Sequence, residues 1–305
     1  MANTPTHRLA NLSRYIFGTA RLRGDNFPLA DRIKIVRAAM DAGVWFHTSH
    51  QYGNALEVLR AAFDEDRAHV PRLIAKIGWN TIDEMREVIR EHLQRLGIEH
   101  IDIGQLCLGG DLADQFRTGG KCYDDFRRLK EEGIVREFVL EIFPWTSRGP
   151  LEAIKAAYPA SVVDGYIFYL NPLQRFAANP LWELLRDRNE PIIAMRTVGG
   201  GTVHRLRDVP GAAWKDYLRQ RAVEVAPIFE ESACKTWTEF CVRFAFGIPQ
   251  VVATVGATRQ MDNLQQFFEA VRDVQPLPQE IQAKISALQA RWSDDVDVHA
   301  EPWSM

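Results

Sequence analysis

The residues with the clearest chemical potential follow short apolar segments along the chain. They are an imidazole, a phenol, an ammonium, a thiol and a carboxylate: His47, Tyr52, Lys76, Cys107 and Glu141. Gathered at one place, such groups could move protons to and from a carbonyl compound. A phenol with an ordinary pKa of about 10 needs a cation beside it to act as an acid near neutral pH. The chemistry therefore depends on a fold that brings these segments together.

Short apolar segments alternate with amphipathic segments over most of the sequence, which predicts eight strand and helix pairs. The predicted strands are 14–18, 44–47, 73–77, 101–107, 135–142, 162–168, 191–195 and 251–255. The predicted helices are 31–42, 55–63, 81–96, 122–132, 150–157 and 182–188, a long helical region that ends at 246, and 260–271. Eight alternations with unbroken apolar strands are typical of a closed (β/α)8 barrel. An open doubly wound sheet would require a G-x-G-x-x-G turn after its first strand, and the sequence has none.

Local signals refine these boundaries. Thr81 followed by Glu84 forms a capping-box pattern, and Gly97 is placed to end the same helix. A further helix is expected at about 278–292, followed by a tail that reaches residue 305. No low-complexity linker interrupts the pattern, so we predict that residues 1–305 form one (β/α)8 TIM barrel domain with this additional C-terminal helix.

The composition excludes several functional classes. The chain has 46% hydrophobic and 25% charged residues and a formal net charge of -3, which gives no general attraction to nucleic acid or to an anionic membrane. Four scattered cysteines and the absence of an apolar leader or membrane span predict a cytoplasmic protein with reduced thiols. The expected partner is a small molecule, and the oligomeric state cannot be read from the sequence.

In a (β/α)8 barrel the C-terminal ends of the strands and the loops after them form the active site. The five ionisable residues above all lie there, and we expect four further side chains to line a substrate pocket: His50, Trp79, Trp145 and Arg196. Arg196 either pairs with Glu141 across the mouth or binds an anionic substrate. By contrast, His92 is expected on a solvated helix surface.

Several short motifs resemble the aldo-keto reductase family, in the family's order and over nearly the whole chain. They include Phe17-Gly18-Thr19, Tyr52-Gly53, Ala75-Lys76, Arg95-Leu96-Gly97, Gly133-Ile134-Val135-Arg136, Asn171-Pro172-Leu173, Gly199-Gly200-Gly201 and Val255-Gly256-Ala257-Thr258-Arg259. The resemblance implies an aldo-keto reductase-like TIM barrel.

The resemblance also implies a tetrad of Asp, Tyr, Lys and His beside a nicotinamide cofactor, in which Tyr protonates the carbonyl oxygen. Tyr52 and Lys76 match two of these positions, whereas His47 stands at the Asp position and Cys107 at the His position. The incomplete tetrad marks a divergent member. Because the Asp that would hold Lys76 is missing, we expect a lowered pKa for Lys76 and a role as base or nucleophile.

The cofactor contacts implied by the resemblance are divided. The family's Ser-Asn pair for the nicotinamide carboxamide falls on Glu141 and Ile142, and the usual Gln falls on Ile167. The positions that would contact the cofactor's phosphate match the family better, so NADP(H) is the expected cofactor. The cofactor contacts that we predict are Thr19, Gly256, Thr258 and Arg259.

Three functions follow from these residues. The first is NADP(H)-dependent reduction of a hydroxylated or sugar-like carbonyl compound, with Tyr52 as the proton donor. The second is a redox-independent lyase, dehydratase or isomerase that uses Tyr52 and Lys76 with His47 or Glu141 for acid–base chemistry. The third is a non-catalytic member of the family that binds a ligand or a partner. We predict no metal site.

Overall fold

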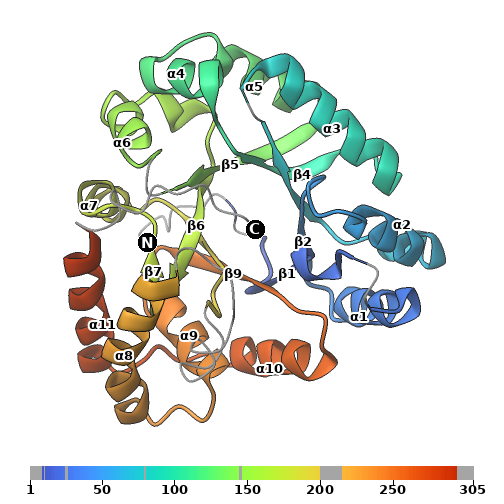
Figure 1. The fold of residues 1–305 in the computed structure, drawn as a ribbon. Coiled ribbons are helices and arrows are strands. Elements are labelled where there is room, and N and C mark those ends of the chain that lie inside the picture. Colours follow the sequence, from blue (N-terminus) through green and yellow to red (C-terminus); the bar gives the residue numbers. More distant parts are fainter. Residues whose placement is uncertain are drawn as a thin grey trace, which may run out of the picture.

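Eight parallel strands lie at the centre of the structure and helices surround them (Figure 1). The computed structural model describes residues 9, 11–24, 27–78, 80–143, 146–199 and 215–293. The strands are β1 (Tyr15–Gly18), β2 (Trp45–Thr48), β3 (Leu73–Ile77), β4 (Ile101–Leu106), β5 (Val135–Ile142), β6 (Gly165–Asn171), β8 (Ile192–Met195) and β9 (Val251–Ala257). They pair in the order β5-β4-β3-β2-β1-β9-β8-β6, and β5 also pairs with β6, which closes the barrel. The predicted (β/α)8 fold is confirmed.

The helices form the outer layer of this barrel (Figure 1). They are α1 (Leu29–Asp41), α2 (Ala55–Glu65), α3 (Ile82–Leu96), α4 (Gly110–Thr118), α5 (Cys122–Glu131), α6 (Arg148–Lys155), α7 (Asn179–Asp187), α8 (Lys215–Glu231), α9 (Trp237–Phe246), α10 (Met261–Arg272) and α11 (Gln279–Trp292). The predicted caps of α3 are confirmed: the Thr81 hydroxyl accepts from the Glu84 amide, and Gly97 adopts a left-handed conformation with φ of 64°. Among the described helices, none is long and apolar enough to cross a membrane.

Several elements differ from the sequence expectations in their boundaries or were not expected. Strand β6 begins at Gly165 rather than at residue 162, because Val162 and Val163 belong to a turn whose amides both bond the Pro159 carbonyl. The helix α4 precedes α5, and the short strand β7 (Gln174–Arg175) pairs antiparallel with the end of β6. The expected irregular stretch at 199–211 and the tail after 293 lie almost entirely outside the described residues.

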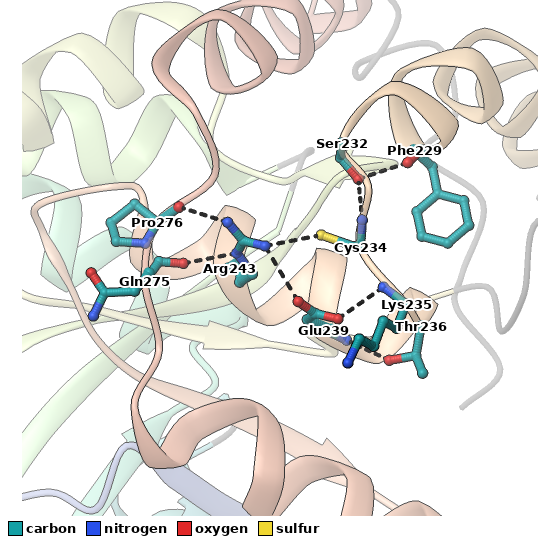
Figure 2. A network of polar contacts seen from close by, with 9 residues as sticks. All are labelled: Phe229, Ser232, Cys234, Lys235, Thr236, Glu239, Arg243, Gln275 and Pro276. Atoms are coloured by element: carbon teal, nitrogen blue, oxygen red, sulfur yellow. Dashed lines mark hydrogen bonds and ion pairs between the residues drawn. The ribbon is translucent and has the colours of Figure 1, made fainter.

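The long helical region that precedes β9 is two helices rather than one. Ala233 has a positive φ of 56°, which ends α8, and the Thr236 hydroxyl then accepts from the Glu239 amide at the start of α9. Figure 2 shows that Arg243 of α9 contacts both the turn before α9 and the segment between α10 and α11. Its guanidinium donates to the carbonyls of Gln275 and Pro276 at 3.0 and 3.3 Å, which fastens the segment between α10 and α11 to α9.

Candidate active site

Alternate side chains of the barrel strands point inward and form two layers. The layer farther from the C-terminal strand ends is apolar and contains Ile16, Trp45, Ile74, Ile103, Val139, Ile167, Ile193 and Ala253. Two residues further along their strands come Lys76, Gln105, Glu141 and Tyr169. A strand repeats its side-chain direction every second residue, so these four residues form a polar layer above an aliphatic floor. The polar layer borders the mouth of the barrel.

Glu141 of β5 is the centre of a buried network in the polar layer. Its Oε1 atom lies 3.1 Å from Lys76 Nζ, and its Oε2 atom accepts from Cys107 Sγ at 2.7 Å. All three side chains are buried. Burial alone would lower the pKa of Lys76, but the Glu141 carboxylate outweighs it and raises that pKa well above its ordinary value. The prediction of a lowered Lys76 pKa is therefore wrong, because Glu141 supplies the carboxylate that His47 cannot.

Cys107 is a protonated hydrogen-bond donor in this network. Burial and the adjacent Glu141 carboxylate both raise the pKa of the Cys107 thiol. A thiol in such surroundings is a poor nucleophile, since nucleophilic attack requires the thiolate. Cys107 therefore holds the second oxygen of Glu141 while Lys76 holds the first.

Tyr52 follows β2 in the turn that leads into α2. Its amide donates to the Ser49 carbonyl at 3.1 Å, and its ring centroid lies 6.4 Å from that of His47. Burial raises the pKa of Tyr52, whereas the Lys76 ammonium acts in the opposite direction. The phenol is therefore protonated near neutral pH, with the Lys76 cation close enough to stabilise a phenolate.

His47 is neutral and engaged by Gln105. Its Nε2 atom lies 2.6 Å from Gln105 Oε1, and both side chains are buried. Burial and the Lys76 charge lower the pKa of His47 to about 4. At neutral pH the imidazole therefore donates its Nε2 proton to the amide oxygen and carries no charge.

The opposite side of the mouth carries arginines from the segments that follow β1, β8 and β9. Burial and the positive charges of Arg196, Arg23 and Arg259 lower the pKa of Arg21, so Arg21 lies near each of the other three cations. Arg196 has a positive φ of 53°, and its guanidinium lies 5.2 Å from the centre of the Tyr169 ring. Such a concentration of guanidinium groups suits an anionic ligand.

A family model for the aldo/keto reductase family matches residues 14–290. The chain belongs to this family. One similar solved structure is the aldo-keto reductase AKR11C1 from Bacillus halodurans in its holo form, with 21% sequence identity and a TM-score of 0.69 over 91% of this chain and 92% of that chain. Another is the thermostable aldo-keto reductase Tm1743 in complex with the inhibitor epalrestat, with 13% identity and a TM-score of 0.66 over 91% of this chain and 95% of that chain. No curated protein matches the sequence significantly.

The aldo-keto reductase barrel places the predicted catalytic residues at one end, but it changes the interpretation of the predicted cofactor contacts. The Thr19 hydroxyl is fully buried and donates to Thr48 at 2.8 Å, so it joins β1 to β2. Gly256 lies inside β9, where an added Cβ atom would come within 2.2 Å of the Phe267 ring. The Thr258 hydroxyl is bonded to Gln260. Arg259 is the one predicted cofactor contact whose side chain is exposed in the described structure.

Of the predicted substrate residues, one lies at the mouth, one packs against a helix and two lie outside the described residues. Arg196 lies at the mouth, whereas the His50 ring contacts the His92 ring from α3 with centroids 5.7 Å apart. His92 is completely buried rather than solvated, so that expectation was wrong. Trp79 and Trp145 lie outside the described residues.

Two polar residues of the site were not predicted as site residues. Gln105 lies inside the predicted strand 101–107, one residue before the end of β4, and Tyr169 falls beyond the predicted end of β6. The signal that could have found both is the strand period of two, which extends from Ile103 to Gln105 and from Ile167 to Tyr169. The rings of Tyr169 and Phe176 stack with their centroids 4.5 Å apart, and the Arg196 guanidinium lies over the Tyr169 ring.

Proposed function

We propose that the protein is an NADP(H)-dependent reductase of a hydroxylated or sugar-like carbonyl compound, with Tyr52 as the proton donor. The observation that supports it best is the buried pair of Lys76 and Glu141 beside Tyr52. This pair keeps the ammonium charged, which is the condition a phenol requires to act as an acid.

The residues of the mouth fit the phosphate groups of such a cofactor. Arg259 precedes α10, and Arg21 lies within the electrostatic reach of Arg259, Arg196 and Arg23. Guanidinium groups bind phosphate oxygens through paired, charge-assisted hydrogen bonds. When bound, NADPH supplies a hydride to the carbonyl carbon. We assign the phosphates, and no other part of the cofactor, to these arginines.

The proton transfer can be derived from the chain's own groups. The substrate carbonyl oxygen accepts a hydrogen bond from the Tyr52 hydroxyl and is polarised by the Lys76 ammonium. As negative charge develops on this oxygen, the Tyr52 proton moves to it and leaves a phenolate. The Lys76 cation stabilises the phenolate until a solvent proton restores the phenol. Glu141 keeps Lys76 in place and charged, and Cys107 keeps Glu141 in place.

A redox-independent lyase, dehydratase or isomerase is the second candidate, and Glu141 is the observation that favours it. The two positions that resemble the family's carboxamide holders carry Glu141, whose oxygens already bond Lys76 and Cys107, and Ile142, whose side chain packs in the outer core. In this candidate Glu141 or His47 removes a proton from the carbon next to the carbonyl, and Tyr52 protonates the leaving group.

Titration with NADPH, followed by calorimetry and by the fluorescence of the tryptophans, separates the two candidates. The reductase predicts saturable binding and NADPH oxidation with small hydroxyaldehydes. Tyr52→Phe should keep the binding and lose about 10³-fold in kcat, in the range expected for a general acid. If NADPH does not bind to the folded protein, the reductase proposal is wrong and the redox-independent candidate replaces it.

A further inference from the structure

The amide nitrogen of Gln105 is a buried donor with no hydrogen-bond partner at normal distance among the described residues, and the Cys107 thiol, whose pKa the Gln105 side chain lowers, is only a weak acceptor. Gln105 is fully buried, its Oε1 atom is bonded to His47, and Nε2 has no hydrogen-bond partner among the described residues. Native proteins seldom leave such a donor unpaired, because the buried group has lost its hydrogen bonds to water. Exchanging the amide oxygen and nitrogen would leave the oxygen unpaired instead, so the conclusion does not depend on that assignment. Since none of the described residues supplies a strong acceptor, we look for the partner in a bound ligand.

The surroundings of Gln105 restrict what this group can be. Below it lies the aliphatic floor that includes Ile103 and Val139, so the group must come from the mouth. Gln105 is paired in register with Lys76 across β3 and β4, which places their backbones about 4.8 Å apart with both side chains in the polar layer. The group therefore belongs to a molecule that also lies beside Lys76.

The charge of the site selects a neutral oxygen. Gln105 is neutral, and His47 is neutral at pH 7 because burial lowers its pKa to about 4. Lys76, whose backbone pairs with that of Gln105, is already paired with the Glu141 carboxylate. A carboxylate or phosphate next to Gln105 would be repelled by the Glu141 carboxylate, and this network holds no further cation among the described residues to neutralise it. A hydroxyl, by contrast, would meet neutral donors and acceptors.

We propose that Gln105 is a specificity-determining residue that binds the hydroxyl oxygen on the carbon next to the reacting carbonyl. This inference rests on the proposed function, because Tyr52 and Lys76 then hold the carbonyl oxygen while Gln105 binds the neighbouring oxygen. The substrate class is accordingly a 2-hydroxy carbonyl compound. His47 positions the Gln105 amide by donating to its oxygen.

The test compares three aldehydes that differ by one hydroxyl: 2-hydroxypropanal, 3-hydroxypropanal and propanal. We expect wild-type kcat/KM for 2-hydroxypropanal to exceed the other two at least about tenfold, the scale of one satisfied buried hydrogen bond. Gln105→Met keeps the size of the side chain and should reduce this ratio to about one, and the ratio is the readout because losing the contact with His47 changes kcat/KM for all three aldehydes alike. Gln282→Met is the matched control, since Gln282 is a partly buried glutamine of α11 that bonds the Phe244 carbonyl.

The outcomes are distinct. The inference is overturned if Gln105→Met keeps the wild-type ratio of kcat/KM values, which would happen if an ordered water alone bonds the amide. It is also overturned if wild type prefers 3-hydroxypropanal or propanal. If no aldehyde is reduced by wild type, the reductase proposal fails, and saturation-transfer NMR without cofactor then decides the inference. Binding of 2-hydroxypropanal that is lost in Gln105→Met supports it, and equal binding to both proteins overturns it. Thermal unfolding of both variants checks that they are folded.

Discussion

The two halves of the barrel mouth handle charge in different ways. The half built by β2 to β5 buries its ionisable groups and compensates them internally, as in the contact of Lys76 with Glu141. The half built by β8, β9 and β1 collects like charges, and its exposed members include Arg23 and Arg259. A buried charge needs a permanent partner, whereas an exposed cation is stabilised by water until an anion arrives. The proposed function assigns the proton transfer to the first half and the anionic ligand to the second, so we call them the reacting half and the ligand-binding half.

The largest expected effect comes from breaking the buried pair on one side only. Glu141→Gln leaves Lys76 buried without its carboxylate, which should destabilise the protein by about 3–5 kcal/mol and lower activity by at least about 10²-fold. Lys76→Met combined with Glu141→Gln should recover most of the stability and none of the activity. Urea unfolding and steady-state rates measure the two effects.

The control for this prediction is Glu57→Gln, which breaks the exposed contact of Glu57 with Arg95 and should cost under about 1 kcal/mol. If Glu141→Gln and Glu57→Gln had equal effects on the midpoint of unfolding, the reacting half would not depend on internal compensation, and the contrast between the halves would fail.

The sequence predicted the barrel well because its signals are local and periodic. Strand 73–77 and strand 135–142 were predicted with the boundaries that the structure has, and Gly97 ends α3 as its position indicated. The site was predicted in part. That Tyr52, Lys76 and Glu141 share one end follows from the fold, but the contact of Lys76 with Glu141 joins strands that are not neighbours, and no local pattern encodes it.

The errors have a common physical origin. Lys76 was expected to lose its charge because the position that resembles the family's Asp holds His47, whereas the compensating carboxylate comes from β5. His92 lies on α3, where a helical histidine is ordinarily solvated, yet packing against His50 buries it completely. Both errors concern which distant element a side chain meets, which composition and spacing do not determine.

The second prediction concerns the neutral histidines near the reacting half. Burial lowers the pKa values of His47 and His92 to about 4, below the ordinary value of 6.5. Between these values the unfolded chain binds more protons than the folded protein. The free energy of unfolding should therefore be at its full value above pH 6.5 and fall as the pH drops toward 4, by up to about 3 kcal/mol for each histidine.

The measurement is chemical denaturation of wild type and His92→Leu at intervals from pH 7 to pH 4.5. The variant lacks one of the two histidines, so its stability should fall less steeply below pH 6.5. Parallel curves for wild type and His92→Leu would contradict the conclusion that His92 is buried in its neutral form.

The smallest expected effect tests the ligand-binding half. Arg259→Ala should weaken NADPH binding about tenfold, roughly the contribution of one charge-assisted hydrogen bond, and should change NADH binding little because NADH lacks the additional phosphate. The loss should shrink as salt is raised, since Arg259 is exposed and its charge is screened. Arg272→Ala is the matched control, because Arg272 is an exposed arginine at the opposite end of the same helix, α10. An equal loss for NADPH and NADH, or an equal effect of Arg272→Ala, would mean that the arginines attract anions only through general charge. The assignment of a specific phosphate contact to Arg259 would then be wrong, and the ligand-binding half would hold anions without a defined position for each phosphate.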